Sequence, residues 1–351
     1  TKLNLFVNRA MSVMMPVMML IMNLTSILIV WAGARYIDAG NLEIGSMLAF
    51  IQYAMQIIIS FLFIAMMFIF LPRAAVSMGR VGEILKKEIS ITDKENTQEI
   101  RDKCGVVEFK NVSFRYADAE DAVLSDISFN AKPGETTAFI GSTGSGKTTL
   151  VNLIPRFFDV TEGSITIDGV DIRDMKQHDL REMIGYVPQK GMLFSGDIKS
   201  NIAYGAEDKS FENIKRAAEV AQAEDFIMEK EEGFDAPVAQ GGTNVSGGQK
   251  QRLSIARALA KKAPIYIFDD SFSALDFKTD AALRKELKKS AGESTLLIVA
   301  QRISTIADAD QIIVLNEGRI AGKGTHKELM QTCGVYREIA SSQLDSGKGE
   351  M

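Results

Sequence analysis

A glycine-rich segment constrains the fold of this chain more than any other feature of its 351 residues. The segment reads TTAFIGSTGSGKTTLVNLI, and it fits the spacing G-x-x-x-x-G-K-[S/T] at Gly141, Gly146, Lys147 and Thr148. A β-rich run precedes the motif and a helical run follows it, which is the context that a phosphate-binding loop requires. The sequence therefore predicts an α/β domain that binds the phosphates of a nucleotide.

The chemistry of this loop follows from its residue types. Glycines let the backbone curl so that its N–H groups face phosphate oxygens, and the N-terminus of the following helix adds favourable dipole charge. Lys147 is expected to reach the β- and γ-phosphates, and the Thr148 hydroxyl is expected to ligate Mg²⁺. We therefore expect ATP and Mg²⁺ as ligands. The predicted nucleotide-binding residues are Gly141, Ser142, Thr143, Gly144, Ser145, Gly146, Lys147, Thr148 and Thr149.

Two adjacent carboxylates follow a second apolar run, in IYIFDD. Asp269 ends this predicted strand, where it would hold Mg²⁺ directly or through a water molecule. Asp270 stands where a general base for the attacking water would sit. The sequence thus assigns a metal role to Asp269 and raises the question of whether Asp270 is an adequate base.

The front of the chain is far more apolar than the rest. Uncharged runs of 25 and 29 residues lie between Arg9 and Arg35 and between Glu43 and Arg73. About 20 predominantly apolar residues cross a membrane, so we expect a partial transmembrane domain at 1–80 with spans at about 11–35 and 45–72. Buried core helices and a cleaved signal peptide fit two such runs poorly.

Charges at the ends of these runs indicate their orientation. Lys2 and Arg9 precede the first run, and Arg73 and Arg80 follow the second. The excess of basic residues on cytoplasmic loops then places both outer ends in the cytoplasm, although Arg35 works against this assignment. We expect a multi-pass protein of the cell membrane whose nucleotide-binding domain is cytoplasmic.

The remaining composition excludes several classes of protein. The net charge of −5 argues against a nucleic-acid binder. Cys104 and Cys333 lack metal-type spacing, which favours a reducing compartment. His178 and His326 form no metal-ligand cluster with them. A charged linker is predicted at 81–104, the nucleotide-binding domain at 105–345 and a tail at 346–351.

A third segment resembles a known family. NVSGGQKQRLSIARAL, at 244–259, is similar to the signature segment of ATP-binding cassette (ABC) proteins. Its opening residues would begin a helix whose N-terminus faces the γ-phosphate of a second nucleotide. The resemblance thus adds Ser246, Gly247, Gly248 and Gln249 to the expected nucleotide-binding residues.

Other family elements occur in the expected order. Tyr116 in FRYAD resembles the aromatic residue that stacks on adenine, and Gln189 in YVPQ resembles the glutamine that senses Mg²⁺ and the attacking water. SALD, at 273–276, resembles the loop that crosses to a partner domain. Two spans joined to one cassette resemble the end of an ABC exporter half-transporter. Such subunits have six spans, so we expect this chain to be an incomplete one.

The resemblance implies a two-part fold. Two transmembrane helices would precede an α/β P-loop ABC ATPase domain that carries an antiparallel β subdomain and a helical signature subdomain. It also implies an ABC-type ATPase activity that drives export.

Three residues depart from the family pattern. The usual glutamate after the Mg²⁺ aspartate is Asp270, the usual histidine of a later stretch is Gln301, and the usual acidic residue before the signature is Gln240. This combination resembles the degenerate-site subunit of heterodimeric bacterial multidrug ABC exporters. It implies a catalytic set of Asp270, Gln301 and Gln189 that binds ATP but hydrolyses it slowly.

Elementary chemistry agrees with that reading. Asp and Glu have similar unperturbed pKa values, about 3.9 and 4.3, so basicity does not separate them. Asp is one methylene shorter, and a displacement of about 1 Å can cost roughly 100-fold in rate. Gln301 can donate to a phosphate oxygen but cannot carry a proton or a positive charge.

The expected partners follow from this asymmetry. We expect a second half-transporter subunit, a different chain with Glu and His at the matching positions, together with the membrane, a small-molecule or lipid substrate and no nucleic acid. One alternative is a non-hydrolysing nucleotide-sensing regulatory subunit of a membrane complex. Another is a soluble ABC ATPase, which the two apolar runs disfavour.

Overall fold

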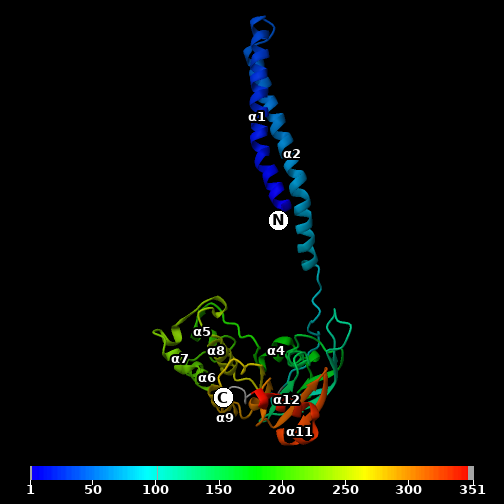
Figure 1. Cartoon of the computed structure of the whole chain (residues 1–351), viewed down its shortest axis with the longest axis vertical. Coiled ribbons are helices and arrows are strands. Elements are labelled where there is room, and N and C mark those ends of the chain that lie inside the picture. Colours follow the sequence, from blue (N-terminus) through cyan, green and yellow to red (C-terminus); the bar gives the residue numbers. More distant parts are fainter. Residues whose placement is uncertain (1, 101, 347–351) are drawn as a thin grey trace. The chain divides into compact units, whose positions relative to one another are not determined.

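The computed structural model describes residues 2–100 and 102–346. The chain forms two compact units, Thr1–Ser90 and Ile91–Met351. The first unit is helical, and the second contains the strands and the shorter helices (Figure 1). Each unit is considered by itself below.

The first unit consists of two long helices that pack against each other, α1 (Lys2–Asp38) and α2 (Ile44–Leu85). Ser12–Asp38 and Ile44–Leu85 are long and apolar enough to cross a membrane, with mean hydropathies of 2.2 and 2.6 in their most apolar windows. None of either window is buried within the unit. This exposure fits helices whose apolar surface meets lipid or further helices.

Helix α2 does not end with its apolar run. It continues through Pro72 and the charged stretch that follows, as far as Leu85. An interior proline removes one helical hydrogen bond and crowds the preceding turn, yet the flanking turns remain helical. The segment predicted to be a linker from residue 81 therefore begins as the last turn of this helix.

The second unit contains twelve strands and ten α-helices among its described residues. Its strands are β1 (Val107–Phe114), β2 (Leu124–Ala131), β3 (Thr136–Gly141), β4 (Glu162–Ile167), β5 (Val170–Asp171), β6 (Ile184–Val187), β7 (Gly196–Asp197), β8 (Pro237–Val238), β9 (Ile265–Asp269), β10 (Thr295–Val299), β11 (Gln311–Asn316) and β12 (Arg319–Gly324). Its helices are α3 (Lys147–Leu153), α4 (Gln177–Glu182), α5 (Ile198–Ile202), α6 (Phe211–Val220), α7 (Glu224–Met228), α8 (Gly247–Ala260), α9 (Phe277–Ser290), α10 (Ile303–Ile306), α11 (His326–Thr332) and α12 (Gly334–Ser346).

The central sheet has six strands in the order β12-β11-β3-β10-β9-β6. The strands from β11 to β6 are parallel, and β12 pairs antiparallel at one edge. Strands β9 and β10 are buried along their whole length, as expected for apolar strands covered on both faces. Val299 of β10 pairs with Phe139 of β3 and with Asp269 of β9, so the carboxyl ends of these strands meet at one edge.

A second sheet is antiparallel, with the order β2-β1-β4-β5. Buried and exposed residues alternate along most of β2, as on a sheet with one solvated face. Its inner face packs through Phe129, whose ring lies 4.5 Å from that of Phe109 and 5.4 Å from that of Phe139 on the central sheet. This arrangement confirms the predicted antiparallel β subdomain.

The opposite face of the central sheet carries helices. Helices α5, α6 and α8 pack on one another (Figure 1), and α8 also packs on β6. Residues of α6 and α8 share one buried apolar core with Ala138, Phe268 and Ile298 of the sheet. This arrangement confirms the predicted helical subdomain, and with it the predicted fold class.

Candidate functional site

The glycine-rich loop links β3 to α3 at the carboxyl edge of the central sheet. Gly144 and Gly146 have φ angles of +82° and +96°, a range that favours glycine. A Cβ atom on Gly141 would lie 2.2 Å from the carbonyl oxygen of Leu315 on β11. The loop therefore needs glycine for conformation at two positions and for close packing at the third.

Lys147 begins helix α3 and folds back over the loop. Its Nζ donates to the carbonyl oxygens of Gly141, at 2.9 Å, and of Ser142, at 2.8 Å. Burial lowers the pKa of Lys147, and the nearby carboxylates of Asp270 and Asp269 oppose that shift. The ammonium group is thus held at the loop, on the side that faces both aspartates.

Thr148 and Asp269 come together from residues 121 positions apart in the chain. The Thr148 hydroxyl donates to Asp269 Oδ1 at 3.0 Å. Asp269 is 1% exposed, and its burial raises its pKa, which the hydrogen bond from Thr148 opposes. A hydroxyl and a carboxylate side by side are the oxygen donors that Mg²⁺ takes beside phosphates. These residues therefore fit the metal that the sequence predicts.

One carboxylate oxygen of Asp270 accepts hydrogen bonds from two side-chain amides. Gln301 Nε2 donates to its Oδ2 at 2.7 Å, and Gln189 Nε2 donates to the same atom at 3.2 Å. The residue has a φ of +48°, a left-handed conformation that costs energy outside glycine. Burial raises the pKa of Asp270, and the hydrogen bonds from Gln189, Ser273 and Gln301 oppose that shift.

A cavity of about 350 Å³ joins these groups. The predicted site residues that line it lie either in the phosphate loop and the start of α3 or at or just after the ends of the parallel strands. They are Thr143, Gly144, Gly146, Lys147, Thr148, Thr149, Gln189, Asp269, Asp270 and Gln301. Gly141, Ser142 and Ser145 belong to the same loop but lie outside the lining, where Gly141 and Ser142 serve as acceptors for Lys147.

Tyr116 lies beside the loop and does not line this cavity. Its hydroxyl is 3.0 Å from Thr149 Oγ1, and its ring packs edge-on against Phe114 and Phe158, with centroids 4.8 and 5.2 Å away. The ring is half-buried. Its stacking on adenine stays a prediction, because the contacts here fix only the position of the ring.

The signature residues also lie outside the cavity. Ser246 is the N-cap of α8, where its Oγ accepts from the Gln249 N–H at 3.2 Å and its own N–H donates to Gln249 Oε1 at 3.1 Å. This reciprocal pair is a capping box, which stabilises a helix start. Gly247 has open space around it, with no atom within 4 Å of an added Cβ. The signature residues are thus separate from the cavity that holds Lys147.

Sequence reasoning overlooked two residues, Val123 and Val299, which line the cavity. Ser273, which was predicted only as the start of the SALD loop, donates through Oγ to the carbonyl oxygen of Asp270 at 2.9 Å. Val299 ends β10, and the Asp270 N–H donates to its carbonyl oxygen at 3.0 Å. The rule that sites form at the carboxyl ends of parallel strands would have identified Val299. No local signal identifies Val123.

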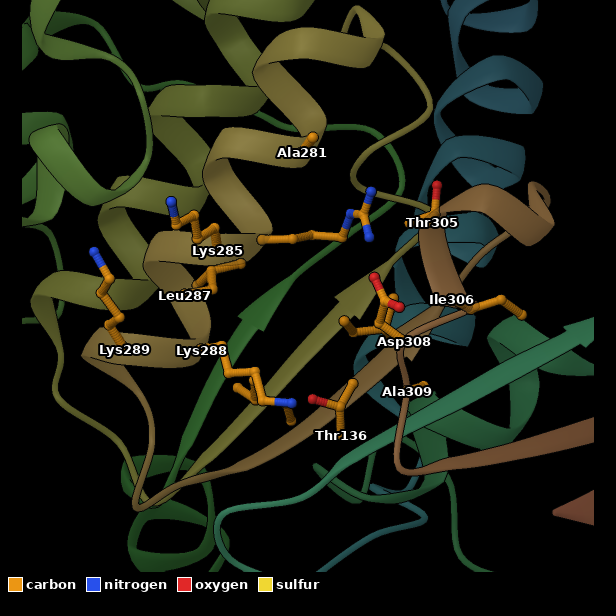
Figure 2. Close-up of a pocket in the computed structure, with 13 residues that line it drawn as sticks. Thr136, Ala281, Lys285, Leu287, Lys288, Lys289, Thr305, Ile306, Asp308 and Ala309 are labelled. Atoms are coloured by element: carbon orange, nitrogen blue, oxygen red, sulfur yellow. The ribbon is translucent and has the colours of Figure 1, made fainter. Parts of the chain in front are cut away.

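A larger cavity of about 740 Å³ lies between α9, α10 and the sheet, away from the phosphate loop. Figure 2 shows Lys285, Lys288 and Lys289 on one side of it and Asp308 on the other. Leu287 and Ile306 contribute apolar walls. This hollow has no glycine loop and no paired aspartates, so the smaller cavity is the candidate nucleotide site despite its size.

Comparisons with known proteins agree with this geometry. Residues 124–273 match the family model of the ABC transporter domain. The uncharacterized ABC transporter ATP-binding protein YfiB of Bacillus subtilis is 45% identical over 94% of this chain. YgaD of the same organism, which carries a provisional name as a multidrug export ATP-binding/permease protein, is 39% identical over 92% of the chain.

A solved structure is also similar. A bacterial Atm1-family ABC exporter with ATP bound matches 87% of this chain with a TM-score of 0.73 and 35% identity. The chain covers 53% of that protein, 57% of YfiB and 56% of YgaD. It therefore spans about half the length of the relatives that it matches.

Proposed function

Because this chain belongs to the ABC transporter family, we propose that it is the ATP-binding part of an exporter subunit. In this proposal ATP binding and hydrolysis drive a small-molecule or lipid substrate outward across the membrane. The observation that carries the proposal is the cavity that joins Lys147, Thr148 and Asp269 at the end of the parallel strands. The names of the similar exporters support the direction of transport.

The residues of the cavity suggest how ATP is held. Loop N–H groups and the start of α3 would bind the phosphate oxygens, because a helix N-terminus favours negative charge. Lys147 would exchange its carbonyl acceptors for the β- and γ-phosphates. Mg²⁺, held by Thr148 and Asp269, would neutralise charge on the phosphates.

The same residues suggest why hydrolysis at this site is slow. The Asp270 carboxylate would have to accept the proton of the attacking water, but it is short and both amides bind its Oδ2. Gln301 would donate to a γ-phosphate oxygen without adding positive charge. The site would therefore bind ATP well and turn it over slowly.

The proposal includes a partner and a place in the cell. The apolar spans at about 11–35 and 45–72 would lie in the cell membrane as part of a multi-pass domain. Two helices cannot enclose a path for substrate, because two packed cylinders leave no closed space between them. A second half-transporter, with Glu and His at the positions of Asp270 and Gln301, would complete both the path and the fast ATP site.

Reconstitution tests this function. We expect purified complexes that contain this chain to show ATPase activity in liposomes and to move substrate only with ATP. A complex that binds ATP, shows no steady hydrolysis and changes the activity of a membrane partner would instead be a nucleotide-sensing regulator. The presence of Asp270 and Gln301 supports this second function, because the same residues would make hydrolysis slow.

A further inference from the structure

The C-terminal helix α12 contacts the segment that carries Gln301. The side-chain amide of Gln343, near the end of this helix, forms two hydrogen bonds there. Its Nε2 donates to the carbonyl oxygen of Gln301 at 2.6 Å, and its Oε1 accepts from the Ile303 N–H at 2.8 Å. One side chain thus binds the backbone on both sides of Arg302.

The hydrogen bond from the Ile303 N–H to Gln343 caps the N-terminus of helix α10. Helix α10 begins at Ile303, and its N-cap Arg302 makes no side-chain cap hydrogen bond. The first N–H groups of a helix have no partner within the helix. Gln343 supplies an acceptor to one of them from a distant part of the chain, so the start of α10 depends on α12.

Helix α12 is well placed to act as a fixed support. Tyr336 is fully buried, its hydroxyl lies 2.8 Å from His326 Nδ1, and Ala340 is also buried. Val335 and Ile339 pack against the apolar core that α6 and α8 share with the central sheet. Because the helix is anchored over two turns, Gln343 projects from a rigid element.

The segment is held at its other points as well. The Ala300 N–H donates to the carbonyl oxygen of Phe139 at 3.1 Å, and the Arg302 guanidinium lies 5.2 Å from the ring centre of Phe277. Gln301 lies between these contacts, and its own amide donates to Asp270. The Gln301 backbone, which Gln343 holds, thus fixes the point from which that amide reaches Asp270.

We propose that Gln343 is a positioning residue that orients Gln301 toward Asp270 and toward the γ-phosphate of ATP. This inference rests on the proposed function of the site. It makes the C-terminal helix part of the nucleotide site, although no residue of α12 lines the cavity. Displacement of α12 would change the response of the site to the γ-phosphate while leaving the phosphate loop intact.

The test compares ATP and ADP affinities of the purified full chain and its variants, because only ATP carries the γ-phosphate. Gln343→Met keeps the length and packing of the side chain but removes both hydrogen bonds. Loss of an oriented hydrogen bond to a charged group costs about tenfold in affinity. We expect Gln343→Met to weaken ATP binding about tenfold and to leave ADP binding unchanged. Glu338→Ala, an exposed position on the same helix, is the control and should change neither affinity.

A second background separates positioning from general damage. In Gln301→Ala, the side chain that Gln343 would orient is missing, so adding Gln343→Met should cause no further loss of ATP affinity. Hydrogen exchange at residues 300–306 should rise in Gln343→Met and stay unchanged in Glu338→Ala. Two results would overturn the inference. One is that Gln343→Met binds ATP and ADP as tightly as the parent chain does. The other is that Gln343→Met lowers ATP affinity equally in the parent and in the Gln301→Ala background. Failure of the parent chain to bind ATP would instead refute the proposed function.

Discussion

Gln301 Nε2 donates a 2.7 Å hydrogen bond to Asp270 Oδ2, so the two main departures from the family pattern touch each other. The effects of mutations at two residues in contact are generally not additive. A histidine in place of Gln301 and a glutamate in place of Asp270 would form a different pair, with a longer acid and a group that carries a proton. The contact supports the view that both changes belong to one altered site.

Reversal of both changes should restore hydrolysis at this site. We expect the double variant Asp270→Glu, Gln301→His to hydrolyse bound ATP at least about tenfold faster than the parent, because the longer carboxylate recovers about 1 Å of reach. Each single variant should give less than half of the rate gain of the double variant, because the effects of the two residues are coupled. Single-turnover hydrolysis in the purified complex measures this, and a double variant no faster than the parent would contradict it.

Lys147 should dominate nucleotide affinity. Lys147→Ala removes the cation held at the loop by two carbonyl oxygens, and charge-assisted hydrogen bonds are worth about 1.5–3 kcal/mol. We expect ATP affinity to fall by at least about tenfold. Lys132→Ala, at an exposed lysine outside the cavity, provides the matched control and should bind ATP normally. Equal affinities of the two variants would remove Lys147 from the site.

Tyr116 should contribute through its ring. Stacking of a base on an aromatic side chain is worth about 1–3 kcal/mol in nucleic-acid binders. Tyr116→Ala should therefore weaken ATP binding more than Tyr116→Phe or Tyr116→Trp. Tyr116→Phe also removes the contact with Thr149 Oγ1, so a small loss in that variant measures the hydroxyl alone. Titration with a fluorescent ATP analogue distinguishes the three variants, and equal affinities would exclude stacking.

The sequence predicted the fold and the nucleotide loop well because both depend on local signals. Glycines at fixed spacing and apolar runs of β-rich residues identify β3, α3 and β9 without tertiary information. The sequence assigned Thr148 and Asp269 to Mg²⁺ separately, each from its own motif, and the structure places the two side chains in contact. Two long uncharged runs likewise predicted the two helices of the first unit.

Other features depend on long-range contacts and left no local signal. Gln343 was unremarkable in sequence, because its importance comes from reaching the backbone of Gln301 and Ile303 across 40 residues of chain. Val123 lines the cavity only because the strand that follows it packs beside the loop. Composition alone also did not give the exact end of α2, which the structure places at Leu85.

The segment that leads from the first unit into the second is held by specific contacts. Asp93 Oδ1 accepts from the backbone and side-chain N–H groups of Gln177, the first residue of α4. Lys94 pairs with Asp174, and the N-cap Lys176 supplies no side-chain cap. Asp93 therefore caps α4 from outside the helix. Asp93→Ala should destabilise the domain by about 1 kcal/mol, measured by urea unfolding against Asp93→Asn, which keeps the acceptor.

The charge of Asp93 gives this contact a pH dependence. The backbone N–H and the side-chain amide of Gln177 hold the pKa of Asp93 below its ordinary value of 3.8. Its stabilising effect is therefore complete above 3.8 and is lost as the pH falls through the lowered value. The stability difference between the parent chain and Asp93→Asn should shrink as the pH falls below 3.8. A difference that grows on acidification would contradict this role.

In the proposed function, the ATP site of this chain is slow, and its signature segment completes a fast site with a partner subunit. The most direct measurement is the steady-state ATPase rate of the purified heterodimer that carries Gly248→Asp or Asp270→Asn in this chain. An added Cβ at Gly248 would lie 3.3 Å from the nearest atom, the Ala274 carbonyl oxygen, so the substitution should be accommodated with a small local shift. We predict that Gly248→Asp abolishes most of the activity and that Asp270→Asn removes only a minor part. Equal losses in the two variants would show that Asp270 is a working base, and the asymmetric account would be wrong.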